Sequence, residues 1–250
     1  MKSLTFIDWF AGVGGFRKGM ENAGHKCIGF CEYDKYAIAS YTSMHLITEE
    51  QRNYLSTLDL KKRQKEILKD EYRNGEWFRS DIREVRGNEV PRADCWCFGA
   101  PCQSFSVAGR RQGLEGESGL IREIFRLVRE IKEKDRPEWL IYENVKGMFS
   151  SNKGFDFFAI LIELDELGYD VEWKLFNSKY YGVPQNRERV YTVGHLRSCG
   201  RREIFSEEGS SSEDSFQVRD LKINQIGQYN TLQRENSNRY RVYSVDGESP

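Results

Sequence analysis

The chain has 250 residues and a mass of 29.3 kDa, with 38 basic residues against 39 acidic ones and a formal net charge of −1. This length is enough for one large domain, or a domain with an appendage, built around a substantial core. Charged residues make up 31% of the chain, and no apolar run approaches the roughly 20 residues of a membrane span, which excludes a membrane protein. The N-terminal apolar run contains Asp8 and lacks a cleavage pattern, which excludes a signal peptide.

Short apolar segments alternate with amphipathic ones along most of the chain. In the first half we expect a strand at 4–10, a glycine turn at 12–15, a helix at 16–23, a strand at 26–31, a helix at 35–46 and a charged, solvated helical insertion at 48–74. In the second half we expect strands at 93–98, 139–142, 171–176 and 189–196, with helices at 120–132 and 155–167. This alternation predicts an α/β fold with a doubly wound, mostly parallel sheet, whose ligands lie beyond the carboxyl ends of the strands.

The composition changes near the end of this pattern. Residues 198–250 are more polar than the rest, contain a linker at 205–215, and close with an alternating strand pattern at 240–245. An Asp-Gly turn signal follows that strand without a return strand. We therefore expect one main domain at residues 1–197, and at residues 198–250 a linker and the beginning of an incomplete structural unit.

Six cysteines are too few for a disulfide scaffold, and without an export signal a reducing compartment is expected. Cys95 and Cys97 are one residue apart in an expected strand, so alternation places both thiols on one face. A zinc site needs a second ligand pair at fixed spacing, and none of the three histidines is suitably placed. We expect buried thiols and no metal.

A glycine-rich loop with the sequence Phe10-Ala11-Gly12-Val13-Gly14-Gly15 lies between the first strand and the first helix. The dinucleotide fingerprint G-x-G-x-x-G fails because Arg17 replaces its third glycine, which favours a smaller nucleoside ligand over a nicotinamide dinucleotide. Glu32 ends the second strand, where a carboxylate accepts hydrogen bonds from both ribose hydroxyls. Tyr33 offers a ring for stacking an adenine. Asp81, which we expect to follow a further, third strand between the insertion at 48–74 and Asp81 itself, offers an acceptor for the exocyclic amine of the adenine. The alternative is a glycine turn that serves helix packing, with acids on a solvated edge.

Three further segments carry reactive side chains at the same predicted edge of the sheet. Cys102 lies in Pro101-Cys102-Gln103-Ser104-Phe105-Ser106, after the fourth strand, where a thiolate nucleophile belongs. Glu143 follows the next strand in Glu143-Asn144-Val145. Gln185, Arg187 and Arg189 alternate along an extended segment, so that two guanidiniums point the same way and can bind phosphate or a base. Taken singly, these are also the features of a structural loop cysteine, a solvated acid and a surface ion-pair run.

The order and spacing of these four motifs resemble the cytosine-C5 DNA methyltransferase family over about residues 4–196. The resemblance implies the Rossmann-like fold of S-adenosylmethionine-dependent methyltransferases, with S-adenosylmethionine as cofactor and double-stranded DNA as substrate. It implies cofactor contacts from the glycine loop and from the later segments: Phe10, Ala11, Gly12, Gly14, Gly15, Glu32, Tyr33, Asp81, Ile82, Pro101 and Leu120. It implies Cys102 as nucleophile, Glu143 as the carboxyl that engages the base, and Arg187 and Arg189 as base-pocket arginines. Substrate contacts are expected from Gln103, Ser104, Ser106, Asn144, Val145 and Gln185.

The chemistry of cytosine explains why these residue types are needed. C5 is a poor nucleophile until the Cys102 thiolate adds to C6, and a protonated Glu143 at N3 stabilises the charge that develops there. A stacked base cannot be reached, so the cytosine must flip out of the duplex. A restriction-modification or phage setting and a cytoplasmic location in a prokaryotic or phage-infected cell are expected with this family.

The resemblance ends before the family's target-recognition region and final helix. We therefore expect a second polypeptide that supplies both, although a shortened chain or an interrupted gene would give the same sequence. Two other readings share the family. One is the tRNA-methylating branch, whose Cys-Phe-Thr stretch is not found here, and the other is a silent regulatory or binding relative, which the intact Cys102 and Glu143 oppose.

Overall fold

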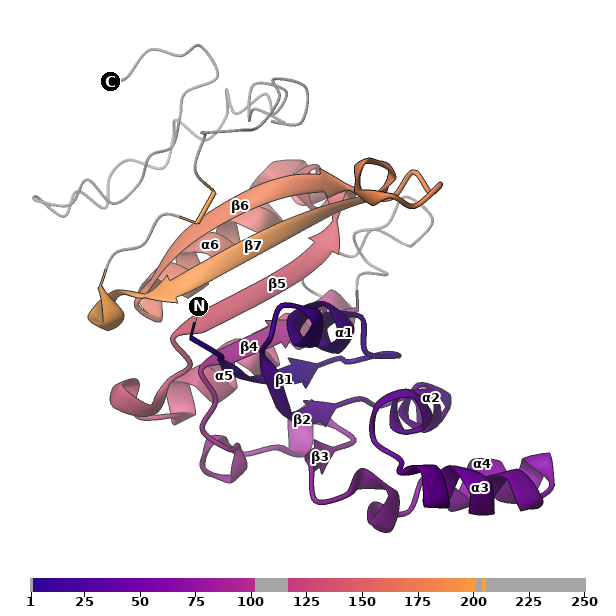
Figure 1. Cartoon of the computed structure of the whole chain (residues 1–250). Helices are drawn as coiled ribbons and strands as arrows, with labels where there is room; N and C mark the ends of the chain where they lie inside the picture. The colour runs from indigo at the N-terminus through magenta and orange to yellow at the C-terminus, as the bar shows by residue number, and fades with distance from the viewer. Residues whose placement is uncertain (1, 102–116, 201–203, 206–250) are drawn as a thin grey trace, which may run out of the picture.

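The computed structural model describes residues 2–101, 117–200 and 204–205, and within them the strands form one seven-stranded sheet (Figure 1). The strands are β1 (Thr5–Trp9), β2 (Lys26–Cys31), β3 (Trp77–Arg79), β4 (Cys95–Phe98), β5 (Trp139–Val145), β6 (Tyr169–Asn177) and β7 (Glu188–Leu196). The helices are α1 (Gly15–Asn22), α2 (Lys35–His45), α3 (Glu49–Thr57), α4 (Leu60–Glu66), α5 (Ile121–Glu130) and α6 (Phe155–Glu166).

The strand order is β3-β2-β1-β4-β5-β7-β6. The first five strands in this order pair in parallel, whereas β7 runs antiparallel to both β5 and β6. The doubly wound, mostly parallel sheet predicted from the sequence is therefore confirmed. The order reverses at β1 and β4, whose carboxyl ends lie next to each other, and this is the position where such sheets bind ligands.

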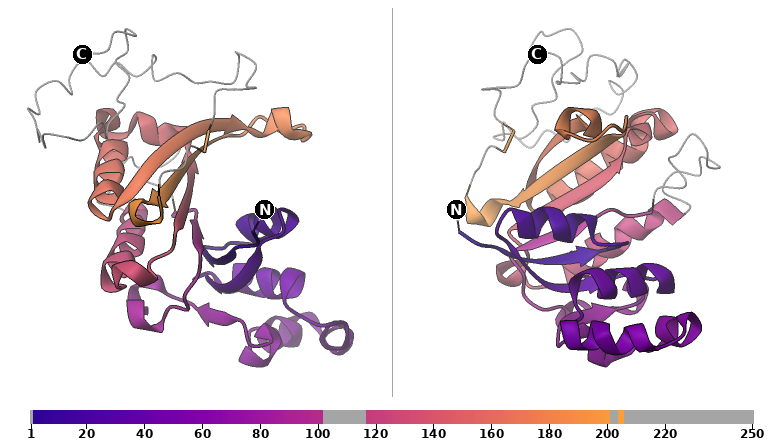
Figure 2. Two further views of the ribbon diagram at one scale, coloured as in Figure 1. Left: turned by 60° about the vertical axis from the view of Figure 1, so that its left-hand side comes forward. Right: turned by 45° about the vertical axis from the view of Figure 1, so that its right-hand side comes forward.

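Helices cover both faces of the sheet. The left view of Figure 2 shows α1 and α2 on one side and α5 and α6 on the other. Strand β4 is buried throughout, and its side chains alternate between the two layers: Cys95 and Cys97 pack with Phe16 of α1, whereas Trp96 and Phe98 join the core under α5. The two sulfur atoms lie 3.8 Å apart on one face, as the alternation predicted.

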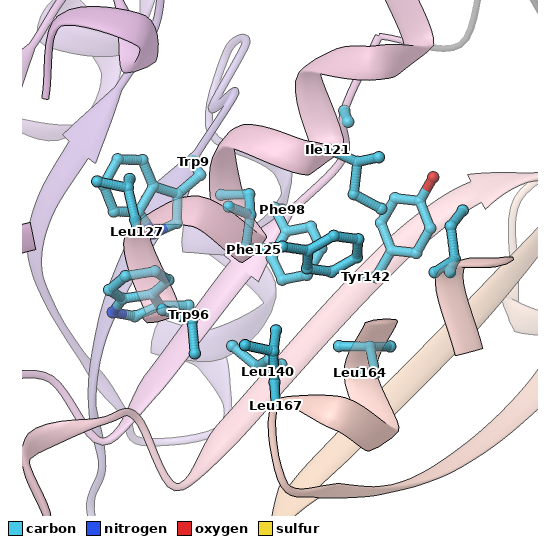
Figure 3. Close-up of a cluster of buried hydrophobic side chains, with 14 of the residues drawn as sticks. Trp9, Trp96, Phe98, Ile121, Phe125, Leu127, Leu140, Tyr142, Leu164 and Leu167 are labelled. Atoms are coloured by element: carbon cyan, nitrogen blue, oxygen red, sulfur yellow. The ribbon is translucent and has the colours of Figure 1, made fainter. Parts of the chain in front are cut away.

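The larger core lies between the sheet and the pair α5 and α6 (Figure 3). Its centre is aromatic: the rings of Trp9 and Trp96 are 5.0 Å apart and those of Phe98 and Tyr142 are stacked at 5.2 Å. Burial of each such side chain contributes roughly 1.5–3 kcal/mol to stability. This core fixes the carboxyl ends of β1, β4 and β5 relative to one another.

The expected helical insertion at 48–74 consists of two helices rather than one. Thr48 and Gln51 form a capping box that starts α3, and the Asp59 side chain accepts a hydrogen bond from the backbone N–H of Lys62 at the start of α4. The insertion has a small core of its own, made by Leu55, Ile67 and Tyr72, while most of its charged residues are exposed.

Strand β5 is longer than the sequence predicted. The pattern ends the strand at Tyr142, but antiparallel pairing with β7 continues to Val145 opposite Arg189. The polar residues Glu143 and Asn144 interrupt the apolar pattern from which the strand was predicted. Their backbones still pair with β7, so the strand continues through them. Glu143 therefore lies within a strand, not in a loop. Of the expected appendage, residues 198–200 and 204–205 are described, and the predicted strand at 240–245 lies outside the described residues.

Candidate active site

The glycine loop after β1 has an unusual backbone. Phe10, Gly12 and Gly14 have φ values of +53°, +55° and +90°, a region that side chains with a Cβ rarely adopt. At Gly14 a Cβ would lie 2.3 Å from His45 Nε2, so a larger residue would displace the His45 ring as well as strain the backbone. His45 Nε2 is in turn 2.9 Å from the carbonyl oxygen of Val13, which ties the loop to α2.

The Glu32 carboxylate is bound to this loop. Its Oε2 accepts a hydrogen bond of 2.7 Å from the Gly12 N–H, and its Oε1 accepts one of 2.8 Å from the Asp34 N–H. The sequence predicted that Glu32 and the loop meet at the carboxyl edge, and the structure brings them together. Each oxygen keeps one lone pair for a further donor.

Asp81 lies at the same edge, directly after β3. Its carboxylate accepts hydrogen bonds from the backbone N–H and the guanidinium of Arg83, and these bonds lower the pKa of the Asp81 carboxyl below its usual value. The Tyr33 side chain is 73% exposed, so its ring offers a free surface. Arg83 contacts both residues, and the sequence reasoning had assigned it no role.

The other predicted cofactor residues differ in exposure. Ala11 and Ile82 are buried, and Ile82 packs in the larger core, while Gly15 is exposed at the start of α1. Pro101 and Leu120 are half-buried on either side of the undescribed residues 102–116. Their proposed cofactor contacts stay predictions.

A buried polar cluster lies beneath the loop, and the sequence reasoning missed it. Arg17 donates to Glu76 Oε1 at 2.6 Å and to the Tyr41 hydroxyl at 3.3 Å, and its backbone N–H donates to Asp8 Oδ2 at 3.3 Å. Burial raises the pKa of the Asp8 and Glu76 carboxyls. In the sequence, the only sign of this cluster is Arg17. An arginine at the position of the fingerprint's third glycine lies close to the sheet, and its charge needs an acidic partner there.

The second half of the edge is centred on Glu143. Its Oε1 is 2.7 Å from Arg189 Nε, so the structure brings these two side chains together. A Cβ at Gly99 would lie 3.2 Å from Glu143 Oε2, which means that Gly99 makes room for the carboxylate. Burial, with the charge of Glu143, raises the pKa of the neighbouring Tyr191 hydroxyl.

The remaining predicted substrate residues differ in burial: Asn144 is buried, whereas Gln185 and Arg187 are exposed. Asn144 is 2% exposed and donates to the Tyr142 hydroxyl, while its Oδ1 accepts a 2.7 Å hydrogen bond from the Val145 N–H. Gln185 and Arg187 are exposed and precede β7, which begins at Glu188. The Gln185 N–H donates to the carbonyl of Val183, which closes a turn just before the expected extended run, and the run is part of a strand from Glu188 onward.

The predicted nucleophile lies outside the described residues, as do its neighbours Gln103, Ser104 and Ser106. Cys102 follows Pro101 directly in the sequence, and β4 ends at Phe98, which pairs with Tyr142 just before Glu143. Among the described cysteines, burial raises the pKa of the Cys27 and Cys31 thiols to about 12. These two thiols are protonated at neutral pH, so they are structural rather than nucleophilic.

Neither a metal site nor a membrane segment is found in the described parts of the chain. No three His, Cys, Asp or Glu side chains are grouped so that they could hold a metal ion in residues 2–101 and 117–200. Over the same residues no helix is both long and apolar enough to cross a membrane.

Comparison with known proteins identifies the family. A model of C-5 cytosine-specific DNA methylases matches residues 4–71 and 57–244. The chain belongs to this family. The orphan methyltransferase M.SPRI of Bacillus phage SPR is 34% identical over 208 residues, 82% of this chain and 41% of that protein. The type II methyltransferase M.HpaII of Haemophilus parainfluenzae is 37% identical over 201 residues, 80% of this chain and 48% of that protein.

This cytosine methylase chain thus spans about half the length, or less, of the curated relatives it matches. Solved structures have the same fold: the S. pombe Dnmt2 methyltransferase has a TM-score of 0.56 at 18% identity, covering 87% of this chain and 60% of its own. The Entamoeba histolytica methyltransferase EhMeth has a TM-score of 0.55 at 17% identity, covering 84% of this chain and 58% of its own. The fold and the family are those of S-adenosylmethionine-dependent methyltransferases.

Proposed function

We propose that this chain is the cofactor-binding and base-activating part of a DNA cytosine-C5 methyltransferase. The observation that carries the proposal is the Glu143–Arg189 pair, at the same sheet edge as the glycine loop held by Glu32. At this edge the Glu143 carboxyl can engage the nucleobase, and the Glu32 carboxylate can accept hydrogen bonds from a nucleoside cofactor. Methyl transfer requires that both molecules are bound side by side.

The cofactor side of the edge fits S-adenosylmethionine. The two lone pairs that Glu32 retains match the two ribose hydroxyls, the Tyr33 ring offers a stacking surface, and the Asp81 carboxylate accepts from the adenine amine. Loop residues with positive φ let the backbone approach the ligand closely. When bound, S-adenosylmethionine supplies the methyl group that cytosine C5 accepts.

The base side supplies activation. The Cys102 thiolate forms a bond to C6, and the electron pair of the C5–C6 double bond becomes available at C5. Glu143, protonated, donates to N3 and stabilises the negative charge that the addition places there. Arg187 and Arg189 hold the flipped base and its phosphate. After methylation C5 loses its proton to a base, the Cys102–C6 bond breaks with return of the electron pair to the thiolate, and the ring regains its double bond.

We also propose that a second polypeptide takes part in target recognition. The curated relatives are about twice as long as the part that they share with this chain. Base readout requires elements inserted into a DNA groove. The setting of a phage or a restriction-modification system accords with the names of the relatives.

The decisive experiment uses tritiated S-adenosylmethionine with duplex DNA and, separately, tRNA, each with and without the product of the neighbouring gene. We expect label in DNA, and a covalent adduct with DNA that contains 5-fluorocytosine, because fluorine at C5 blocks the elimination step. Cys102→Ser should abolish both while S-adenosylhomocysteine still binds with nearly unchanged affinity. Label in tRNA alone, or an active preparation without an adduct, would contradict the proposal.

A further inference from the structure

Arg83 forms a fork on the Asp81 carboxylate at the cofactor edge. Its Nη2 donates to Oδ2 at 2.5 Å, and its Nε lies 2.8 Å from Oδ1 and 3.1 Å from Oδ2. The Arg83 backbone N–H donates to Oδ1 at 3.0 Å, because Asp81 also caps the short helix Ile82–Glu84. The carboxylate is therefore fixed in both position and plane.

Counting lone pairs shows what this fork leaves open. An ionised carboxylate has about four acceptor sites, two on each oxygen. The backbone N–H and Nε occupy the two sites of Oδ1, and Nη2 occupies one site of Oδ2. Nε has a single hydrogen, so its 3.1 Å contact with Oδ2 is the longer arm of a bifurcated bond and not a further donor. One acceptor site of Asp81 Oδ2 remains, on a side chain that is still 15% exposed. That site takes one N–H donor and repels a carbonyl oxygen.

The same guanidinium also contacts the exposed ring of Tyr33. The Arg83 Cζ lies 5.7 Å from the ring centroid, within the range of a cation–π contact. Tyr33 comes from the end of β2 and Asp81 from the end of β3, so Arg83 connects two neighbouring loops at this edge. Both side chains that would frame a purine are thus held by one residue.

We propose that Arg83 is a positioning residue that gives the cofactor site its preference for a 6-amino purine over a 6-oxo purine. The inference rests on the proposed function, since it takes Asp81 and Tyr33 as the purine site. Arg83 orders the Asp81 carboxylate before the ligand arrives, so the open acceptor site faces the exocyclic amine without a further loss of side-chain freedom. A 6-oxo purine brings its carbonyl oxygen against the same fixed acceptor, and this unpaired contact is what rejects it.

A role in folding is not the explanation for this pair. The Arg83 side chain is 59% exposed, and exposed ion pairs contribute little to stability. Arg92 and Asp135 offer a control, because they form an exposed pair at 3.8 Å, with Arg92 on the segment that enters β4 and Asp135 on the segment that enters β5. Removal of either arginine changes the net charge by the same amount.

The test is calorimetry of the 250-residue chain with S-adenosylhomocysteine and with S-inosylhomocysteine. We expect Arg83→Ala to weaken S-adenosylhomocysteine binding by roughly 3- to 10-fold and to reduce the adenosyl-over-inosyl preference by a similar factor. Arg83→Lys should be intermediate because an ammonium cannot fork. Arg92→Ala should leave both affinities unchanged, and the melting temperatures of all variants should agree. Asp81→Asn, whose amide can donate to a carbonyl, should favour the inosyl ligand.

The outcomes separate this inference from the proposed function. If the natural chain binds S-adenosylhomocysteine and Asp81→Asn changes the preference, but Arg83→Ala does not, the positioning role is overturned and the function stands. If Arg83→Ala weakens both ligands equally, or Arg92→Ala has the same effect, the contribution is one of general charge and the inference is overturned. If the natural chain binds neither ligand, the proposed function itself fails.

Discussion

One carboxylate, Glu32, joins the ends of β1 and β2 by accepting from the Gly12 and Asp34 N–H groups. We expect Glu32→Ala to weaken S-adenosylhomocysteine binding by roughly 1.5–3 kcal/mol, the range of a charge-assisted hydrogen bond. Glu32→Gln keeps one acceptor oxygen and should lose less. Calorimetry measures the affinities, and a fall in turnover at unchanged affinity would place Glu32 outside the cofactor site.

A second single-residue prediction concerns Gly99. A methyl group there would lie 3.2 Å from Glu143 Oε2, so the carboxylate must move by a few tenths of an ångström. Small displacements of a reacting group can cost up to ~100-fold in rate, and we expect Gly99→Ala to lower kcat while S-adenosylhomocysteine affinity is unchanged. The measurement is steady-state methyl transfer by the active assembly.

Gly19 provides the control for this substitution. It lies within α1, and nothing is within 4 Å of the position its Cβ would take. Gly19→Ala should keep full activity and raise the free energy of unfolding by about 1 kcal/mol, because glycine is a poor helix former. Equal losses of kcat in the two variants would show that Gly99 has no special relation to Glu143.

At the scale of elements, local pattern predicted more of the fold than of the site. The strand predicted at 93–98 contains the observed Cys95–Phe98, because a strand that is covered on both faces has a continuous apolar run that is visible in the sequence. The length of β5 was not predictable, since Glu143 and Asn144 obtain their strand geometry from β7, about 45 residues away. Contacts such as Arg17 with Glu76 join segments that are distant in sequence, and no local pattern encodes them.

The Arg17–Glu76 pair connects α1 to the segment that enters β3, and both side chains are largely buried, at 8% and 13% exposure. Removing Glu76 leaves the buried Arg17 guanidinium with Glu21, on the same helix, as its remaining ionic partner, so Glu76→Ala should cost about 1–3 kcal/mol of unfolding free energy. Lys62→Ala, in the exposed pair with Asp59, should cost less than ~1 kcal/mol. Urea unfolding compares the two, and similar small losses would show that the buried pair does not anchor α1.

For the whole molecule, the strand order divides the candidate site between the two halves of the sheet. The loops after β1, β2 and β3 carry most of the proposed cofactor residues, whereas Glu143 and Arg189 belong to β5 and β7. The two halves meet where β1 pairs with β4. The relative position of methyl donor and base therefore depends on the integrity of the central sheet, and the global stability of the fold matters for chemistry.

Asp8, in the middle of β1, links that global stability to pH. It is 1% exposed, and among the described residues its Oδ1 has no hydrogen-bond partner. Burial raises its pKa well above the ordinary value, the charges of Glu32 and Glu76 act in the same direction, and Arg17 opposes them. The folded state therefore retains a proton that the unfolded chain releases. Stability from this group is complete below the unfolded pKa of about 3.9 and declines as pH rises toward and through the folded pKa.

Asp8→Asn should remove this dependence, because the amide stays neutral and its oxygen can still accept from the Arg17 N–H. Urea unfolding of both proteins at pH 5, 6, 7 and 8 gives the difference in unfolding free energy at each pH. We expect the unfolding free energy of Asp8→Asn, relative to that of the natural protein, to increase as pH rises, by at most about 1.4 kcal/mol per pH unit. Asp94, with its lowered pKa, is not among the charges that act on Asp8, so its contribution cancels between the two proteins. The charge of Glu76 does act on Asp8, so Glu76 is part of the pH dependence that the substitution removes. A difference independent of pH would mean that Asp8 is ionised in the folded protein throughout this range.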